Sequence, residues 1–164
     1  MSWYEASAYT KWLSRKTGKD YRLPTEAQWE KAARGDRDFQ YPWGNTFDKD
    51  NCNAEESGLN RTSPVGIFPA GKSPYDCLDM AGNVWEWCFD WFDENYYKKS
   101  PAKNPQGPSK GEYRVLRGGS WGTTTSDTPS DLLRCASRHR NDPENLWFNN
   151  GFRVVCEINN KKRI

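Results

Sequence analysis

The apolar content of this sequence is mostly aromatic, which limits the kinds of core that the chain can build. Its 164 residues include nine Trp, eight Tyr and seven Phe, yet only 35% are hydrophobic and the mean hydropathy is −1.06. A core with so few aliphatic side chains must rest on large rings, each burying roughly 150–250 Å². Disordered chains are poor in aromatic residues. The composition therefore predicts a folded chain, and thirteen Gly and ten Pro predict many turns.

The length and charge of the chain exclude several classes of protein. A chain of 164 residues predicts a single domain, residues 1–164, with its own core. The net charge of +2 gives no strong field for nucleic acid or a membrane surface. No stretch reaches the roughly 20 apolar residues of a membrane span, and the N-terminus lacks the apolar segment of a signal peptide. We expect no nucleic-acid partner, no membrane span and, by default, a cytoplasmic location.

The five cysteines indicate reduced thiols rather than a zinc site or a disulfide framework. Their number is odd and no two form a CxxC pair, which argues against a zinc knuckle. A core of this size needs no covalent crosslinks. We therefore expect mostly buried, unpaired thiols at Cys52, Cys77, Cys88, Cys135 and Cys156.

Two short helices are predicted by their end signals. Ser2 and Glu5 fit a capping box, and the helix that follows is expected to end at Gly18. A second capping box at Thr25 opens a helix that is expected to stop at Gly35. Strands are predicted over 113–117 and 152–156, whereas 36–110 shows turns without a sustained period. This pattern is typical of a small α+β domain.

Five short segments, in order along the chain, form the most specific pattern in the sequence. They read RLPTEAQWE (22–30), YPWGN (41–45), AGNVWEW (81–87), LRGGSW (116–121) and GFR (151–153). Together they resemble the formylglycine-generating enzyme, or sulfatase-modifying factor, family. The resemblance implies a C-type-lectin-like fold with little regular structure, two short helices and a small antiparallel sheet. The family's domain normally begins before the segment that resembles 2–12, so we expect this chain to lack an N-terminal part.

The family includes enzymes and binding scaffolds. Some members oxidise a sulfatase cysteine to formylglycine with copper held by two cysteines, and iron-containing relatives form carbon–sulfur bonds. Others are binding proteins, including variable proteins diversified by retroelements.

In the oxidases both copper cysteines lie between segments matched here by 118–120 and 134–136. The interval 121–133 contains no cysteine here, and Cu(I) selects thiolate sulfur. We therefore predict no bound copper and no catalytic residues of the oxidase type. The structural disulfide of the enzymes would pair Cys135 with the position of Ala33, so it cannot form.

Other catalytic arrangements have little support in the sequence. An iron site would require two or three His with a carboxylate, but the sequence has one histidine, His139, between two arginines. We expect it to be a surface or packing residue. A Ser120, His139 and Asp142 triad can be written down, but nothing marks the nucleophile. Carboxylate pairs such as Asp90 with Asp93 arise by chance among 22 acidic residues.

The segment around the third motif is a candidate calcium site. A turn with acidic residues at both ends can place two carboxylates and two carbonyls around one hard cation, although Asp beside a Gly turn more often caps backbone amides. The resemblance implies structural calcium on Asp79, Gly82, Val84 and Glu86. A second calcium loop of the family, around 53–54, has its acidic ligand in a segment that is shortened here, and we do not predict it.

Two polar stretches near the C-terminus, 122–131 and 141–149, are the candidate recognition surface, called here the late-loop surface. Rigid aromatic side chains supply contact area at low entropic cost, while Ser, Thr and Asn supply adaptable hydrogen bonds. The cadence of 138–155 also resembles the retroelement-diversified members. The alternative is that 146–148 folds back onto the core. The predicted ligand-binding residues are Thr123, Thr125, Ser126, Asp127, Asn141, Asn145, Leu146, Trp147, Phe148 and Asn149.

Taken together, these observations favour a non-catalytic binding protein whose ligand, a protein or a small molecule, is unknown. We expect Trp147 to be at least partly exposed, and Trp85 and Trp87 to serve the core. The alternative is an enzyme, either a metal-dependent oxidase or a sulfatase-modifying-factor-like protein with an unrecognised site. A third reading is a decayed fragment without function.

Overall fold

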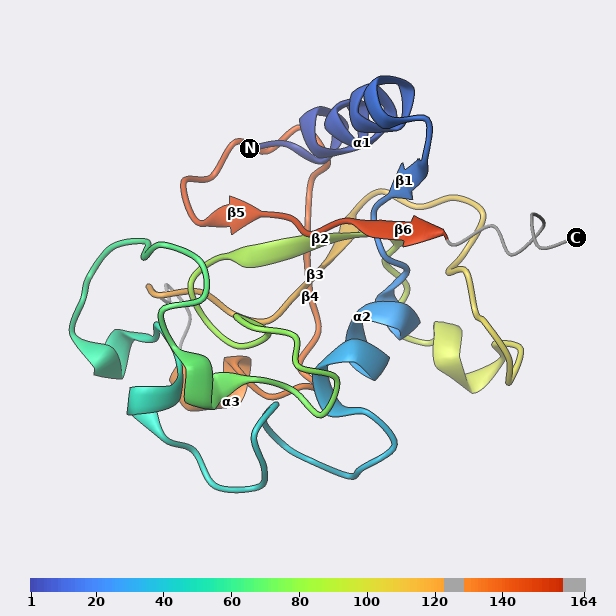
Figure 1. Cartoon of the computed structure of the whole chain (residues 1–164). Coiled ribbons are helices and arrows are strands. Elements are labelled where there is room, and N and C mark those ends of the chain that lie inside the picture. Colours follow the sequence, from blue (N-terminus) through green and yellow to red (C-terminus); the bar gives the residue numbers. More distant parts are fainter. Residues whose placement is uncertain (123–128, 158–164) are drawn as a thin grey trace, which may run out of the picture.

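The structure, a computed structural model, describes residues 1–122 and 129–157. Within these residues it is a mixed α+β fold in which long turns join short regular elements (Figure 1). The helices are α1 (Trp3–Thr17), α2 (Glu26–Arg34) and α3 (Pro129–Leu132), with short 3-10 helices at Lys49–Asn51, Glu55–Ser57, Pro69–Gly71 and Tyr96–Lys98. The strands are β1 (Asp20–Arg22), β2 (Trp85–Trp91), β3 (Arg114–Arg117), β4 (His139–Asn141), β5 (Asn150–Gly151) and β6 (Val155–Glu157).

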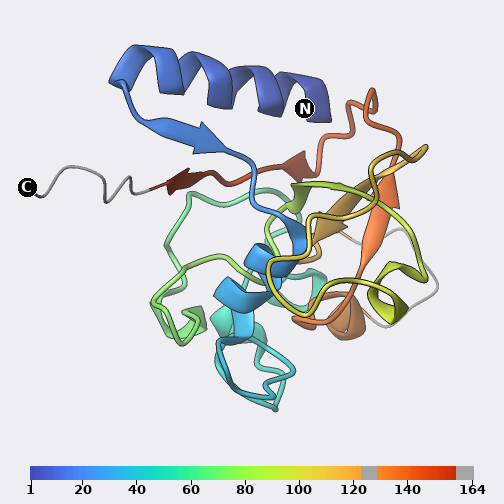
Figure 2. The ribbon, with the colours of Figure 1, turned by 90° about the vertical axis from the view of Figure 1, so that its right-hand side faces the viewer.

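Both predicted helices are confirmed, including their ends. Ser2 and Glu5 form a reciprocal capping box at α1, which closes at Gly18 in the left-handed conformation. The side chain of Thr25 accepts a hydrogen bond from the amide of Gln28 at the start of α2. In Figures 1 and 2, α1 lies above the paired strands β1 and β6, and α2 lies below them.

The strands form two small sheets, which corrects part of the prediction. One sheet has the order β4-β3-β2-β5, with antiparallel pairs except for β2 and β5, which run parallel. Of the predicted strand at 152–156, only 155–156 lies in a strand, β6, which pairs with β1 in the second sheet. The Arg153 side chain, which precedes β6, donates to Glu86 and to the carbonyl of Asp79. The strand β2 lies in a region where only turns were predicted.

The core is built on tryptophan on both faces of the larger sheet. Trp3 of α1, Trp85 and Trp87 pack in one cluster with Leu116. On the other face, Trp29 of α2 packs with Met80, Cys88, Val115 and Cys135. The predictions that Trp85 and Trp87 belong to the core and that the cysteines are unpaired are confirmed. None of the helices in the described parts of the chain is both long and apolar enough to cross a membrane.

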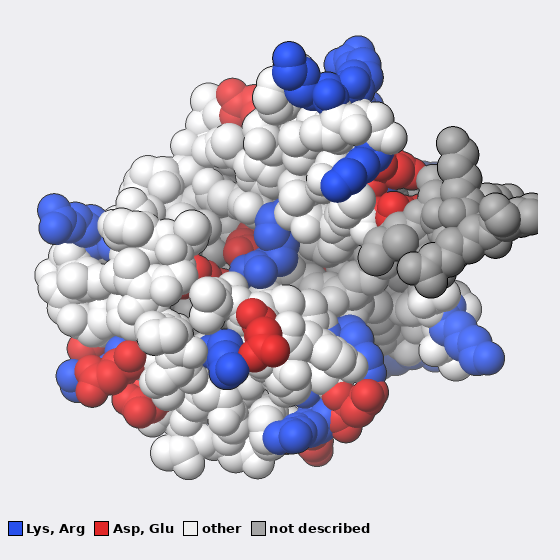
Figure 3. All heavy atoms as spheres, viewed as in Figure 1, with Lys and Arg blue, Asp and Glu red and all other residues white. Residues whose placement is uncertain are grey.

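Charged side chains lie both on the surface and in the interior. On the face seen in Figure 3, basic and acidic residues alternate, and a broad uncharged area lies between them. Several charges also enter the interior as pairs. Glu26 of α2 is buried and binds Arg138, while Arg117 contacts Glu30 from a fully buried position. These pairs tie α2 to strand β3 and to the segment before β4.

Candidate functional site

The loop between β4 and β5 has its backbone fixed by its own polar side chains. The carboxylate of Asp142 accepts a hydrogen bond from the amide of Glu144 at 2.8 Å. The side-chain oxygen of Asn145 likewise accepts one from the amide of Trp147 at 2.8 Å. Short Asp and Asn side chains close turns in this way because they reach main-chain amides two residues on. The Asn-rich sequence therefore specifies a defined loop shape.

The same loop is tied to the body of the protein at several points. The amide of Trp3 donates to the carbonyl of Pro143 at 3.0 Å, which attaches the loop to the start of α1. The amide of Trp85 donates to the carbonyl of Asn149 at 2.8 Å, and the Asn149 side chain donates to the hydroxyl of Ser120 at 3.1 Å. Both ends of the loop thus rest on rigid elements.

The apolar residues of this loop face outward. The exposed fractions are 67% for Leu146, 48% for Trp147 and 73% for Phe148. The ring of Phe148 lies 5.6 Å from that of Trp121, which is partly buried. The expectation that Trp147 is exposed is confirmed, and the alternative that these residues fold back onto the core is wrong. Their main chain is fixed while their side chains remain available.

The other predicted ligand residues differ in their place in the fold and in their exposure. Asn141 ends strand β4, and Asn145 closes the turn described above. Asn149 is 5% exposed and its amide points inward to Ser120, so it supports the loop rather than presenting a contact. Among the predicted ligand residues that the structure describes, Asn149 is thus the buried one. The remaining four, Thr123, Thr125, Ser126 and Asp127, lie outside the described residues.

All four residues of the candidate calcium site lie around one cavity of about 390 Å³. Asp79 and Asn83 have positive φ angles of 55° and 65°, so the turn is tightly wound between them. Gly82 is required at its position, because a Cβ there would lie 2.3 Å from the carbonyl oxygen of Asn53. The turn therefore brings Asp79 and Glu86 toward the same space.

Calcium in this cavity would compete with Arg153 for the carboxylate of Glu86. The carboxylate of Glu86 accepts hydrogen bonds from the indole of Trp29 at 2.7 Å and from two nitrogens of Arg153. One oxygen of Asp79 accepts a bond from the amide of Gly66. Carboxylates and carbonyls suit calcium, but the guanidinium already supplies positive charge. No group of three or more His, Cys, Asp or Glu side chains gathers as a metal site among the described residues.

The chemistry of the buried cysteines differs from that of a catalytic thiol. Burial raises the pKa of Cys135 to about 12, and it raises the pKa of Cys88 well above the ordinary value. Both thiols are therefore protonated at neutral pH, whereas the thiolate is the nucleophile and metal ligand. Cys135 packs in the same cluster as Ala33, the position to which the resemblance assigned its disulfide partner. His139 lies 5.0 Å from the ring of Trp85, as expected of a packing residue.

Comparison with known proteins decides the family. Residues 1–158 match the family described as the sulfatase-modifying factor enzyme 1-like domain. The chain belongs to this family. Its relatives include a protein of Chlamydia caviae named serine/threonine-protein kinase pkn1, 44% identical over 94% of this chain and 23% of that protein. The formylglycine-generating enzyme of Streptomyces coelicolor is 39% identical over 94% of this chain and 51% of that enzyme.

Solved structures extend the likeness to the fold. Treponema denticola variable protein 1 superposes with a TM-score of 0.85 at 28% identity, covering 95% of this chain and 69% of that one. The fold is thus the C-type-lectin-like fold of the formylglycine-generating enzyme class, as predicted. This chain spans about a quarter of the chlamydial relative and about half of the bacterial enzyme.

Proposed function

We propose that this domain is a non-catalytic binding module that recognises its ligand, a protein or a small molecule, through the late-loop surface. The observation that carries the proposal is the row of exposed apolar side chains, Leu146, Trp147 and Phe148, on a loop with a fixed main chain. Contiguous exposed apolar side chains, unlike scattered ones, mark interaction sites on proteins. The likeness to a variable protein of the same fold supports this choice.

Such a surface binds with a small entropic cost, because its main chain is already ordered before the ligand arrives. Loop ordering and side-chain immobilisation consume a large part of the interaction energy in most complexes. Here the turns at Asp142 and Asn145 fix the loop in advance. Trp and other aromatic residues concentrate interface energy, so Trp147 and Phe148 are the proposed anchors. The proposal extends to 122–131, which carries short polar side chains suited to adaptable hydrogen bonds.

A comparison of variants in a capture experiment tests this proposal. The wild-type domain and the double variant Trp147→Ala/Phe148→Ala are each coupled to a photo-crosslinker and exposed to an extract of the source cell. A ligand of the late-loop surface should be crosslinked to the wild type and lost from the double variant. Lys11→Gln, on the exposed face of α1, provides a control that should retain it. Equal recovery by the double variant would remove the late-loop surface from consideration.

An enzymatic function is the second candidate. The observation that favours it is the sequence identity of 39% with the formylglycine-generating enzyme of Streptomyces coelicolor. In that case the chemistry would rest on residues other than the two copper cysteines of the oxidases. Metal analysis of the purified protein separates the two candidates. Stoichiometric copper or iron supports the enzyme, whereas calcium alone supports the binding module.

A further inference from the structure

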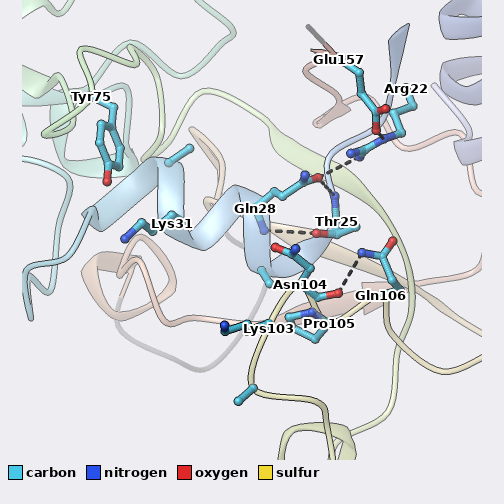
Figure 4. A pocket seen from close by; sticks show the side chains of 13 residues that line it. Arg22, Thr25, Gln28, Lys31, Tyr75, Lys103, Asn104, Pro105, Gln106 and Glu157 are labelled. Carbon is cyan, nitrogen blue, oxygen red and sulfur yellow. Dashed lines mark hydrogen bonds and ion pairs between the residues drawn. The ribbon is translucent and has the colours of Figure 1, made fainter. Parts of the chain in front are cut away.

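A second hollow of the molecule lies along helix α2, with no residue in common with the late-loop surface. Its volume is about 950 Å³, at the upper end of the range of roughly 300–1,000 Å³ for ligand sites. One wall is the outward face of α2, and the other is the segment 103–106 (Figure 4). Tyr75 lies toward one end and the pair of Arg22 with Glu157 lies toward the other. We call this hollow the α2 groove.

Of the four charged residues that line the α2 groove, Arg22, Lys31 and Lys103 are basic and Glu157 is acidic. Arg22 is already used, since it donates to Glu157 at 3.0 Å and to the side chain of Gln28 at 2.8 Å. Lys31 and Lys103 extend from the two opposite walls and are both exposed (Figure 4). Lys103 makes no hydrogen bond or ion pair with the described residues. An excess of one sign of charge in a hollow attracts ligands of the opposite sign, so the two lysines make the α2 groove favour an anion.

The chain itself places a carboxylate at one end of this groove. Asp36 follows α2 and binds the ammonium group of Lys31, and its other oxygen accepts a hydrogen bond from the hydroxyl of Tyr75 at 3.4 Å. The side chain of Asp36 is 82% exposed. Exposed ion pairs contribute little to stability, because water screens them. Asp36 thus shows that a carboxylate can lie between Lys31 and Tyr75, and it is held there only weakly.

The middle of the groove suits a peptide main chain. Amide side chains of Gln28, Asn104 and Gln106 line it, and the residues beside them on α2, Ala27 and Ala32, are small. The oxygen of Gln28 is held by the amide of Thr25 and by Arg22, which fixes the orientation of its amide group. Amide groups both donate and accept hydrogen bonds, as a peptide main chain does.

From this arrangement we infer that the α2 groove binds an extended acidic peptide segment. The peptide's carboxylates would pair with Lys31 and Lys103, and its main chain would lie along the three amide side chains. Asp36 would act as an internal competitor that occupies the Lys31 subsite in the free protein.

Fluorescence anisotropy with a fluorescein-labelled hexapeptide of alternating Gly and Asp tests this inference, with the Gly–Asn hexapeptide as the uncharged match. The Asp peptide should bind more tightly than the Asn peptide. Lys31→Gln and Lys103→Gln should each raise the Kd about two- to fivefold, the range of exposed ion pairs. Asp36→Asn should lower the Kd by a similar factor, because it removes the competitor. Lys11→Gln removes a charge elsewhere and should leave the Kd unchanged.

Several outcomes would overturn the inference. Equal binding of the Asp and Asn peptides would remove the role of charge, and wild-type affinity in Lys103→Gln would place the peptide elsewhere. Weaker binding by Asp36→Asn would mean that Asp36 supports the groove rather than competing for it. Displacement of the peptide by an equal concentration of inorganic phosphate would indicate a simple anion site. All three groove substitutions change exposed side chains, and a thermal melt of each variant verifies folding.

Discussion

Two tryptophans show how the surroundings of a residue decide its role. Trp85 is 5% exposed and packs between α1 and the larger sheet, whereas Trp147 is 48% exposed on the late-loop surface. We predict that Trp85→Ala lowers the free energy of unfolding by about 3–5 kcal/mol, as loss of a core aromatic does. Trp147→Ala should lower it by less than about 1 kcal/mol, as at a surface site. Urea unfolding of both variants checks this, and a similar large loss in both would contradict it.

The buried carboxyl group of Asp90 should make stability depend on pH. Burial, together with the nearby charge of Glu26, raises the pKa of Asp90 to about 6 from 3.8, while the amide of Glu26 donates to it at 2.7 Å. Because the folded state holds this proton more tightly than the unfolded state, the stabilisation is complete below pH 3.8. It is lost as the pH rises through 6.

Asp90→Asn should remove this dependence, because its side chain carries no titrating proton. The free energy of unfolding of the variant, relative to wild type, should therefore rise between pH 4 and pH 7 by up to about 3 kcal/mol, from a shift of roughly two pKa units. Urea unfolding at both pH values measures the difference, with the exposed Asp93→Asn as control. A relative stability of Asp90→Asn that stays constant over this range would show that the charge of Asp90 is compensated.

Among the elements of the fold, the turn from Asp79 to Glu86 is the candidate calcium-binding segment. We predict that calcium binds there and stabilises the fold. A ligand at 100 times its dissociation constant adds about 2.7 kcal/mol, which corresponds to a rise in Tm of about 5–10 °C for a domain of this size. Differential scanning fluorimetry with calcium and with a chelator measures it.

A pair of variants separates calcium binding from the structural role of Glu86, which also contacts Trp29 and Arg153. Glu86→Gln should lose the response of the Tm to calcium, whatever its own stability. Asp76→Asn, which alters an exposed residue bound to Lys72, should keep the response. If the wild-type Tm is the same with calcium and chelator, Arg153 alone supplies the positive charge in the cavity.

The helices could be predicted from the sequence because their end signals are local. Capping side chains such as Ser2 and Thr25 lie next to the amides that they bind. Strand β2 could not be predicted in the same way. Both of its faces are covered, with Trp85 and Trp87 toward α1 and Cys88 toward α2, and its register shifts before Trp91. A strand buried on both faces lacks the alternation of polar and apolar residues that marks a half-buried one.

The same division between local and distant contacts holds for the whole molecule. The motifs predicted the family and the fold, since these follow from short segments in order, and the Asn-rich neighbours of Trp147 predicted its exposure. The pairing of Glu86 with Arg153 and the burial of Asn149 join residues far apart in the sequence. The α2 groove depends on how 102–106 folds back against the helix. The spacing of residues in the sequence predicts none of these three features.

The activity of the whole molecule provides the last prediction. We expect no conversion of a sulfatase-motif cysteine to formylglycine, because no cysteine lies between Cys88 and Cys135 in the sequence. Burial raises the pKa of the Cys135 thiol to about 12, so a soft metal that bound it would have to displace a tightly held proton. The protein, incubated with copper, oxygen and a sulfatase-motif peptide, should leave the peptide mass unchanged in mass spectrometry. Aldehyde above the level of a copper-only blank would contradict this, and its loss in Cys135→Ser would then locate the ligand.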